Sequence, residues 1–223
     1  MAAFTIVHGA WGGGWEWREV ETLLRARGHD VTRPTLTGVG ERAHLFTSSV
    51  GLDTHVEDVV RHLEFEGLEE VVLCGHSYGG MVVTGVVDRV PARVTRLLYV
   101  DAFVPRDGES LLDLLPPGWV AMLRDSAAEG RVPPPADPAY PAWYVERVRD
   151  QPLAAFEQPL RLSGRGDAVP RSYIRCLQSD APLEPSVERA RSAGWTMREI
   201  AAHHDAQIDD PVGLAELLSA LAS

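Results

Sequence analysis

The sequence predicts an α/β fold, in which a mostly parallel sheet of about six strands has helices on both faces and carries a small helical cap insertion. Two observations predict it. Short apolar runs alternate with helical patterns along most of the chain. The runs are apolar throughout, as in strands buried on both faces, and do not alternate with polar residues. With 223 residues and 45% hydrophobic content, the chain is expected to form a single domain.

The expected strands are short runs rich in branched and aromatic residues. They cover residues 4–9, 29–34, 70–75, 94–103, 172–177 and 195–200. The expected helices lie between the strands or end the chain, at residues 17–28 and 56–67, after Ser77, and at residues 184–193 and 211–222. Pro211 begins the last of these helices, where proline is well tolerated.

The alternation stops between residues 105 and 166. This segment contains "LLPPGW" and "VPPPADPAYPAWY". Proline interrupts long helices because it lacks an N–H donor and clashes with the preceding turn. We therefore expect residues 105–166 to form an inserted cap of short helices and loops within the single domain.

Composition narrows the function classes. The formal net charge of −11 and the absence of a basic run disfavour nucleic acid, so a small neutral molecule is the expected partner. All 21 basic residues are arginine, which excludes a Walker or Schiff-base lysine. No apolar stretch approaches the length of a membrane span. Cys74 and Cys176 lie in apolar runs, which favours reduced thiols and a cytoplasmic location. A homodimer is left open.

Residues 75–80, "GHSYGG", place Ser77 between Gly75 and Gly79 after an apolar run and before an apolar helix. This is the G-x-S-x-G pattern of a nucleophilic serine on a strained strand-to-helix turn, where larger flanking residues would clash. A solvated serine in a glycine-rich turn is the alternative. The apolar segments on both sides favour the nucleophile.

A serine nucleophile needs a histidine base, an acid that orients the base, and amides that stabilise the oxyanion. Downstream of Ser77 only His203 and His204 are available, and the residues alone do not choose between them. The glycine-rich turn "HGAWGGGW" at residues 8–15 makes the amides of Ala10 and Tyr78 the natural oxyanion donors. No metal-binding spacing such as H-E-x-x-H is present, so neither a metal nor another cofactor is expected.

These motifs resemble the α/β-hydrolase superfamily, specifically a small-esterase branch with plant methylesterases, hydroxynitrile lyases and bacterial polyketide methylesterases. The similar segments are "HGAWGGGWEWREVETLLRARGHDV", "GHSYGG" and "HHDAQIDDPVGLAELL". The resemblance implies that His204 is the base and that Ala10 and Tyr78 hold the oxyanion. Hydroxynitrile lyases carry a lysine after the base where this chain has Asp205, and epoxide hydrolases and dehalogenases carry an aspartate in place of Ser77. Both activities are therefore disfavoured.

The acid has two candidates. In much of the branch that this chain resembles, the acid follows the strand after the cap. The matching position in "CLQSDAPLEP" is Ser179, with Asp180 one residue later. Asp101, in "LLYVDAFVP", ends the strand expected beside the nucleophile strand, a position that other branches use. A carboxylate among apolar residues is costly to bury unless it is paired. Asp101 lies among such apolar residues, so its burial implies a partner, which favours Asp101 as the acid. Asp180 stays the rival, and a structural role stays the alternative for either residue.

The expected function is therefore that of a serine esterase that cleaves a methyl ester or lactone of an aromatic or polyketide-like metabolite, as in secondary metabolism. Aromatic and apolar residues of the insertion and the sheet edge would wall the substrate pocket. They are Trp11, Phe103, Trp119, Met122, Trp143 and Tyr144. Two rival functions remain, a cofactor-free tailoring enzyme that abstracts a proton with the same residues and a non-catalytic ligand-binding protein on the same fold.

Overall fold

The structure is a computed structural model and describes residues 1–135 and 140–222. Its central sheet has six strands in the order β2-β1-β3-β4-β7-β8, and every neighbouring pair is parallel. The strands are β1 (Ala3–Val7), β2 (Asp30–Thr32), β3 (Val71–His76), β4 (Val94–Val100), β7 (Arg171–Cys176) and β8 (Thr196–Ile200). The predicted parallel sheet of about six strands is confirmed.

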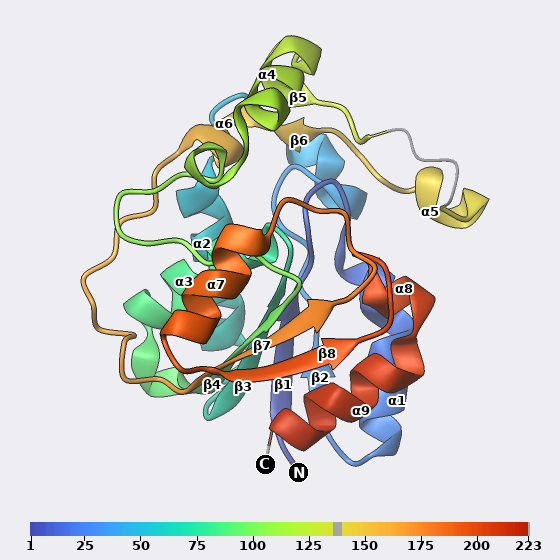
Figure 1. The fold of residues 1–223 in the computed structure, drawn as a ribbon, viewed down its shortest axis with the longest axis vertical. Helices are drawn as coiled ribbons and strands as arrows, with labels where there is room; N and C mark the ends of the chain where they lie inside the picture. Colours follow the sequence, from blue (N-terminus) through green and yellow to red (C-terminus); the bar gives the residue numbers. More distant parts are fainter. Residues whose placement is uncertain (136–139, 223) are drawn as a thin grey trace.

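Helices cover both faces of the sheet, as Figure 1 shows. On one face lie α1 (Arg18–Ala26) and α9 (Pro211–Leu221), and on the other lie α2 (Leu52–Phe65), α3 (Gly79–Arg89) and α7 (Glu184–Ser192). Alternate residues along each strand pack into two hydrophobic cores, one on each face of the sheet. In β3, for example, Val72 and Cys74 face α1 and α9, whereas Val71 and Leu73 face α2 and α3. This burial on both faces explains the continuously apolar strand sequences.

The insertion between β4 and β7 contains short elements. They are a 3-10 turn (Leu112–Leu114), α4 (Pro117–Ser126), β5 (Arg131–Val132), α5 (Ala142–Val145), β6 (Gln151–Pro152) and α6 (Leu153–Glu157). Prolines stand directly before α4, α5 and α6, or in the first turn, which explains why the helices begin there. Figure 1 shows α4 and α6 at one end of the molecule, beyond the carboxyl ends of the strands.

Three features differ from the sequence prediction. Helix α2 begins at Leu52, before the predicted start at residue 56. The loop after β8 contains the short helix α8 (Ala206–Asp209), and β5 pairs with β6 in a two-stranded antiparallel sheet. A single helical turn carries no apolar period, and a two-residue strand pairing between distant segments leaves no local pattern. The remaining 3-10 turns are Gly14–Trp17, Gly40–Leu45 and Pro91–Arg93.

Both cysteines, Cys74 and Cys176, are buried free thiols, as the sequence predicts. Among the described residues, no helix is long and apolar enough to cross a membrane.

Candidate active site

Ser77 lies between β3 and α3 with a backbone φ of +53°, in the left-handed region. Its flanking glycines are required sterically. A Cβ at Gly75 would lie 2.7 Å from the carbonyl oxygen of Gly79, and a Cβ at Gly79 would lie 2.5 Å from that of Val7. The Ser77 carbonyl accepts hydrogen bonds from the amides of Gly80 and Phe103. The turn is therefore held tightly, and the hydroxyl projects at the carboxyl edge of the sheet.

Of the two adjacent histidines, only His204 reaches the serine. Its Nε2 lies 2.9 Å from Ser77 Oγ, and its Nδ1 lies 2.7 Å from Asp101 Oδ2. A carboxylate can only accept, so Nδ1–H donates to Asp101 and Nε2 is left to accept the serine proton. The His203 ring is exposed instead and lies 2.9 Å from Asp209 Oδ2.

Asp101 follows β4 and is only 2% exposed. Its second carboxylate oxygen accepts the amide of Cys176 at 3.1 Å. Its φ of +40° is unfavourable for a residue other than glycine, at about 1–3 kcal/mol. Neighbouring groups of β7 hold this conformation. The Asp101 amide donates to Ile174, and the Tyr173 hydroxyl both accepts from the Ala102 amide and donates to the Ala102 carbonyl.

Asp180, the rival acid, is exposed in the loop after β7. Its side chain makes no hydrogen bond or ion pair within residues 1–135 and 140–222. Ser179, which falls at the register of the resembling branch, accepts the amide of Ala181. The structure thus brings His204 together with Asp101 and not with Asp180, whose remaining influence on the imidazole is that of a nearby negative charge.

Burial alone would lower the pKa of His204. The hydrogen bond to Asp101, together with the negative charges of Asp205, Asp101 and Asp180, outweighs burial and raises this pKa above its ordinary value of 6.5. His76 lies against the same ring, with the two ring centroids 4.8 Å apart. Burial lowers the pKa of His76 to about 4, so its neutral Nε2–H donates to the His204 carbonyl at 3.0 Å.

The amides of Ala10 and Tyr78 donate no hydrogen bond in the part of the chain that the structure describes. Gly9, which precedes Ala10, packs closely against the serine turn, because a Cβ there would lie 3.0 Å from His76 Nδ1 and 3.1 Å from Ser77 Cβ. The two amides are thus available as donors next to the serine.

His8 fixes the peptide plane that carries the Ala10 amide, a role that the sequence analysis missed. Its Nδ1 donates to the Gly9 carbonyl at 2.7 Å, and its Nε2 accepts the Leu36 amide at 3.1 Å. Only a neutral imidazole can donate and accept in this way. Burial lowers the pKa of His8 to about 4, which keeps the ring neutral near pH 7. No local pattern distinguishes this histidine from an ordinary core residue.

The predicted pocket residues are spread over two environments. Trp119, Met122 and Trp143 belong to α4 and α5 and are 38%, 45% and 42% exposed. Tyr144 is half-buried against Trp15, at 5.6 Å between ring centroids. At the sheet edge, Phe103 is buried next to the serine turn and Trp11 is half-buried. Only these last two residues lie on segments adjacent to Ser77 or to the proposed oxyanion donor.

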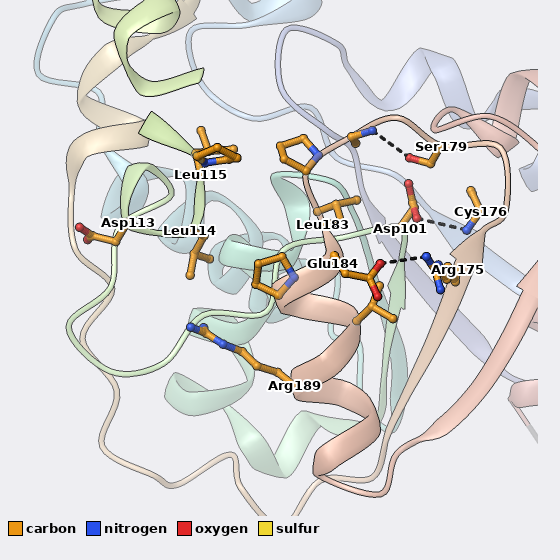
Figure 2. Close-up of a pocket in the computed structure, with 15 residues that line it drawn as sticks. Asp101, Asp113, Leu114, Leu115, Arg175, Cys176, Ser179, Leu183, Glu184 and Arg189 are labelled. Carbon is orange, nitrogen blue, oxygen red and sulfur yellow. Dashed lines mark hydrogen bonds and ion pairs between the residues drawn. The ribbon is translucent and has the colours of Figure 1, made fainter. Parts of the chain in front are cut away.

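A cavity of about 460 Å³ opens beside Asp101, and its walls include neither Ser77 nor His204. Figure 2 shows Asp101 and Cys176 on one side of this cavity and Leu114 and Leu115 of the insertion on the other. None of the predicted pocket residues lines it. Its walls combine apolar residues such as Leu114, Leu115 and Pro182 with charged ones, among them Arg175, which lies 2.9 Å from Glu184.

The family profile described as "Alpha/beta hydrolase family" matches residues 6–217. The chain therefore belongs to the alpha/beta hydrolase family, which confirms the fold prediction and the resemblance. A carbendazim hydrolyzing esterase from Nocardioides sp. (strain SG-4G) is 42% identical over 99% of this chain and 100% of its own length. Methylesterase 8 from Arabidopsis thaliana is 33% identical over 46% of this chain and 38% of its own length.

Among solved structures, an extracellular alpha/beta-hydrolase from a Paenibacillus species superposes with a TM-score of 0.88. It is 25% identical, and the match covers 100% of this chain and 99% of that one. That protein is described as sharing structural and functional homology with tobacco salicylic acid binding protein 2. With its esterase relatives, this fold identifies the chain as a carboxylic ester hydrolase.

Proposed function

We propose that the protein is a serine esterase that works through an acyl-serine intermediate. Ser77 is the nucleophile, His204 the base and Asp101 the acid, and the amides of Ala10 and Tyr78 form the oxyanion hole. One observation carries the proposal. An uninterrupted line of hydrogen bonds, 2.9 Å and 2.7 Å long, joins Ser77 to His204 and His204 to the buried Asp101.

In the first half of the reaction, Ser77 Oγ attacks the ester carbonyl carbon while His204 Nε2 takes the hydroxyl proton. The carbonyl oxygen becomes an oxyanion and accepts from the two amides. Asp101 stabilises the imidazolium that forms. His204 then gives its proton to the departing alkoxide oxygen as the carbon–oxygen bond breaks, and the acyl group stays on Ser77. A water molecule repeats these steps and releases the acid.

The substrate is a small, neutral carboxylic ester, most simply a methyl ester or lactone of an aromatic or polyketide-like metabolite. The names of the relatives, a carbendazim hydrolyzing esterase and plant methylesterases, support this class. The net charge of −11 disfavours strongly anionic substrates. Lyase chemistry with a cationic residue after the base lacks support, because Asp205 is buried there and accepts from Tyr140 and Gln207.

The test is labelling with a fluorophosphonate, mapped by mass spectrometry, beside an assay with p-nitrophenyl acetate. We expect the label on Ser77, no label in Ser77→Ala, and a fall in kcat of about 10⁴-fold or more in both Ser77→Ala and His204→Ala. His203→Ala is the matched control, since that neighbouring ring lies outside the site, and it should retain near-normal activity.

Three results would contradict the proposal. A folded protein that takes no label and turns over no ester would point to a binding protein. Labelling without ester turnover, combined with loss of a proton-abstraction reaction in Ser77→Ala, would point to a tailoring enzyme. A loss in His203→Ala equal to that in His204→Ala would show that the loop geometry differs in solution.

A further inference from the structure

Trp11 follows the proposed oxyanion donor Ala10. Each of its polar groups, the amide, the carbonyl and the indole N–H, is hydrogen-bonded to the insertion. Its amide donates to Gln151 Oε1 at 3.0 Å, and its indole Nε1 donates to the Val132 carbonyl at 3.0 Å. Its carbonyl accepts the amide of Arg149 at 2.9 Å. The partners lie on or next to β5 and β6, the small sheet that the sequence analysis did not foresee.

The backbone of Trp11 needs such support. Its φ is +62°, in the left-handed region that large side chains rarely adopt, at a cost of about 1–3 kcal/mol. The indole also packs edge-on against Phe156 of α6, with ring centroids 5.7 Å apart. Because the residue is strained, its conformation depends on the groups that hold it, and all of these groups come from the insertion.

Of the three hydrogen-bond partners of Trp11 named above, Gln151 is the one that contributes a side-chain atom. It is 1% exposed, so it is as buried as the core. The atom that faces the Trp11 amide must be the oxygen, because that amide is a donor, and this fixes the orientation of the side-chain amide. Its Nε2 has no hydrogen-bond partner among the described residues. An unpaired buried amide nitrogen costs stability, so a glutamine at this position is unfavourable for packing alone and its one bond, to Trp11, is the contact that sets it apart from an apolar residue.

Both neighbours of Ala10 are therefore fixed, by different parts of the molecule. On one side the Gly9 carbonyl is held by His8, and Gly9 packs against Ser77. On the other side Trp11 is held by the insertion. If Trp11 were released, the torsion angles of Ala10 could relax and its amide would move relative to the serine.

We propose that Gln151 is a positioning residue for the oxyanion hole, through which the insertion holds Trp11 and so aims the Ala10 amide at the developing oxyanion. This inference rests on the proposed function. The insertion is then more than a cover over the site, because its small sheet completes the catalytic geometry. An amide aimed at the transition state contributes to kcat rather than to ground-state binding.

The test compares Gln151→Leu, Gln151→Glu and Gln158→Leu. The last is a matched control, because Gln158 lies in the same insertion and its Oε1 likewise accepts a backbone amide, that of Asp53 at 2.9 Å. We expect Gln151→Leu to lower kcat about 10- to 100-fold with KM changed less than about 3-fold. Gln151→Glu keeps an acceptor oxygen, and because burial favours the neutral form of an unpaired carboxyl, its kcat relative to wild type at the same pH should recover most as the pH is lowered. Gln158→Leu should keep wild-type kcat.

Two further readouts separate positioning from general damage. The thermal midpoint should fall in both variants, and less in Gln158→Leu, because the bond from Asp53 to Gln158 is exposed and water can replace it. The kcat values are therefore compared at a temperature well below both midpoints. The acid limb of the pH–rate profile should stay in place in Gln151→Leu, because the pair of His204 and Asp101 is untouched.

Equal kcat in Gln151→Leu and Gln158→Leu would overturn the inference, as would a raised KM with normal kcat or a Gln151→Glu variant no better than Gln151→Leu at every pH tested. These outcomes all require an active wild type. A wild type that neither hydrolyses an ester nor reacts with a fluorophosphonate would instead reject the proposed function itself, and with it the oxyanion that Gln151 would serve.

Discussion

The carboxyl ends of β4 and β7 lie side by side, and an aspartate follows each strand. The one after β4, Asp101, is 2% exposed and contacts both His204 and the amide of Cys176. The one after β7, Asp180, is exposed and has no such contact in the described residues. The comparison teaches that the sheet itself supplies the environment of the proposed acid, since backbone groups of β7 hold the carboxylate that β4 presents. A charge pair shielded from water also interacts more strongly than one in solvent.

The largest effect should separate the two aspartates directly. Asp101→Asn should lower kcat by about 10⁴-fold, because the imidazole loses the partner that fixes its tautomer. Asp180→Asn should stay within about 3-fold of wild type, since the group it replaces is exposed and screened. Steady-state kinetics with p-nitrophenyl acetate measure both. A severe loss in Asp180→Asn with a mild one in Asp101→Asn would reverse the assignment.

An intermediate effect should come from Tyr173, whose hydroxyl holds the turn after Asp101 by two bonds to Ala102. Tyr173→Phe leaves two buried backbone groups unpaired, so we expect unfolding free energy to fall by about 1–3 kcal/mol and kcat to fall about 10-fold. Tyr99→Phe is the control. The Tyr99 hydroxyl is hydrogen-bonded to Thr84 and does not contact Asp101 or Ala102, so the variant should lose stability with little change in kcat. Equal kcat in the two variants would mean that the turn needs no support from β7.

The smallest effects should appear in the pH profile. His204 must be neutral to act as a base, and its pKa is raised, so kcat/KM should fall with decreasing pH through a midpoint above 6.5. Asp205→Asn and Asp180→Asn each remove a negative charge that raises this pKa, so both should move the midpoint to lower pH. The shift should be larger for Asp205→Asn, because Asp205 is buried and acts more strongly on the imidazole. Asp209→Asn, beside His203, should leave the midpoint in place, and a shift as large as that of Asp205→Asn would refute the electrostatic account.

Much of the fold could be predicted from the sequence because the responsible patterns are local. The apolar runs that became β3 and β4 reflect burial on both faces, and the glycines around Ser77 reflect a turn in which backbone oxygens leave no room for a Cβ. The insertion was predictable only as an irregular segment. Its prolines mark where helices begin. They carry no information about the pairing of β5 with β6 or about the hydrogen bonds between that sheet and Trp11.

The sequence by itself determined the α/β architecture, the serine turn and a short choice of partners, because periodicity, glycine and proline act over a few neighbouring residues. Only the tertiary structure selected His204 over His203 and brought it to Asp101 rather than Asp180. His204 is 103 residues from Asp101 and 127 residues from Ser77 along the chain. The distances between these side chains follow from how the strands, the loop after β8 and the insertion pack together. A shift of one residue within that loop, from His204 to His203, turns the imidazole toward solvent without altering any local pattern.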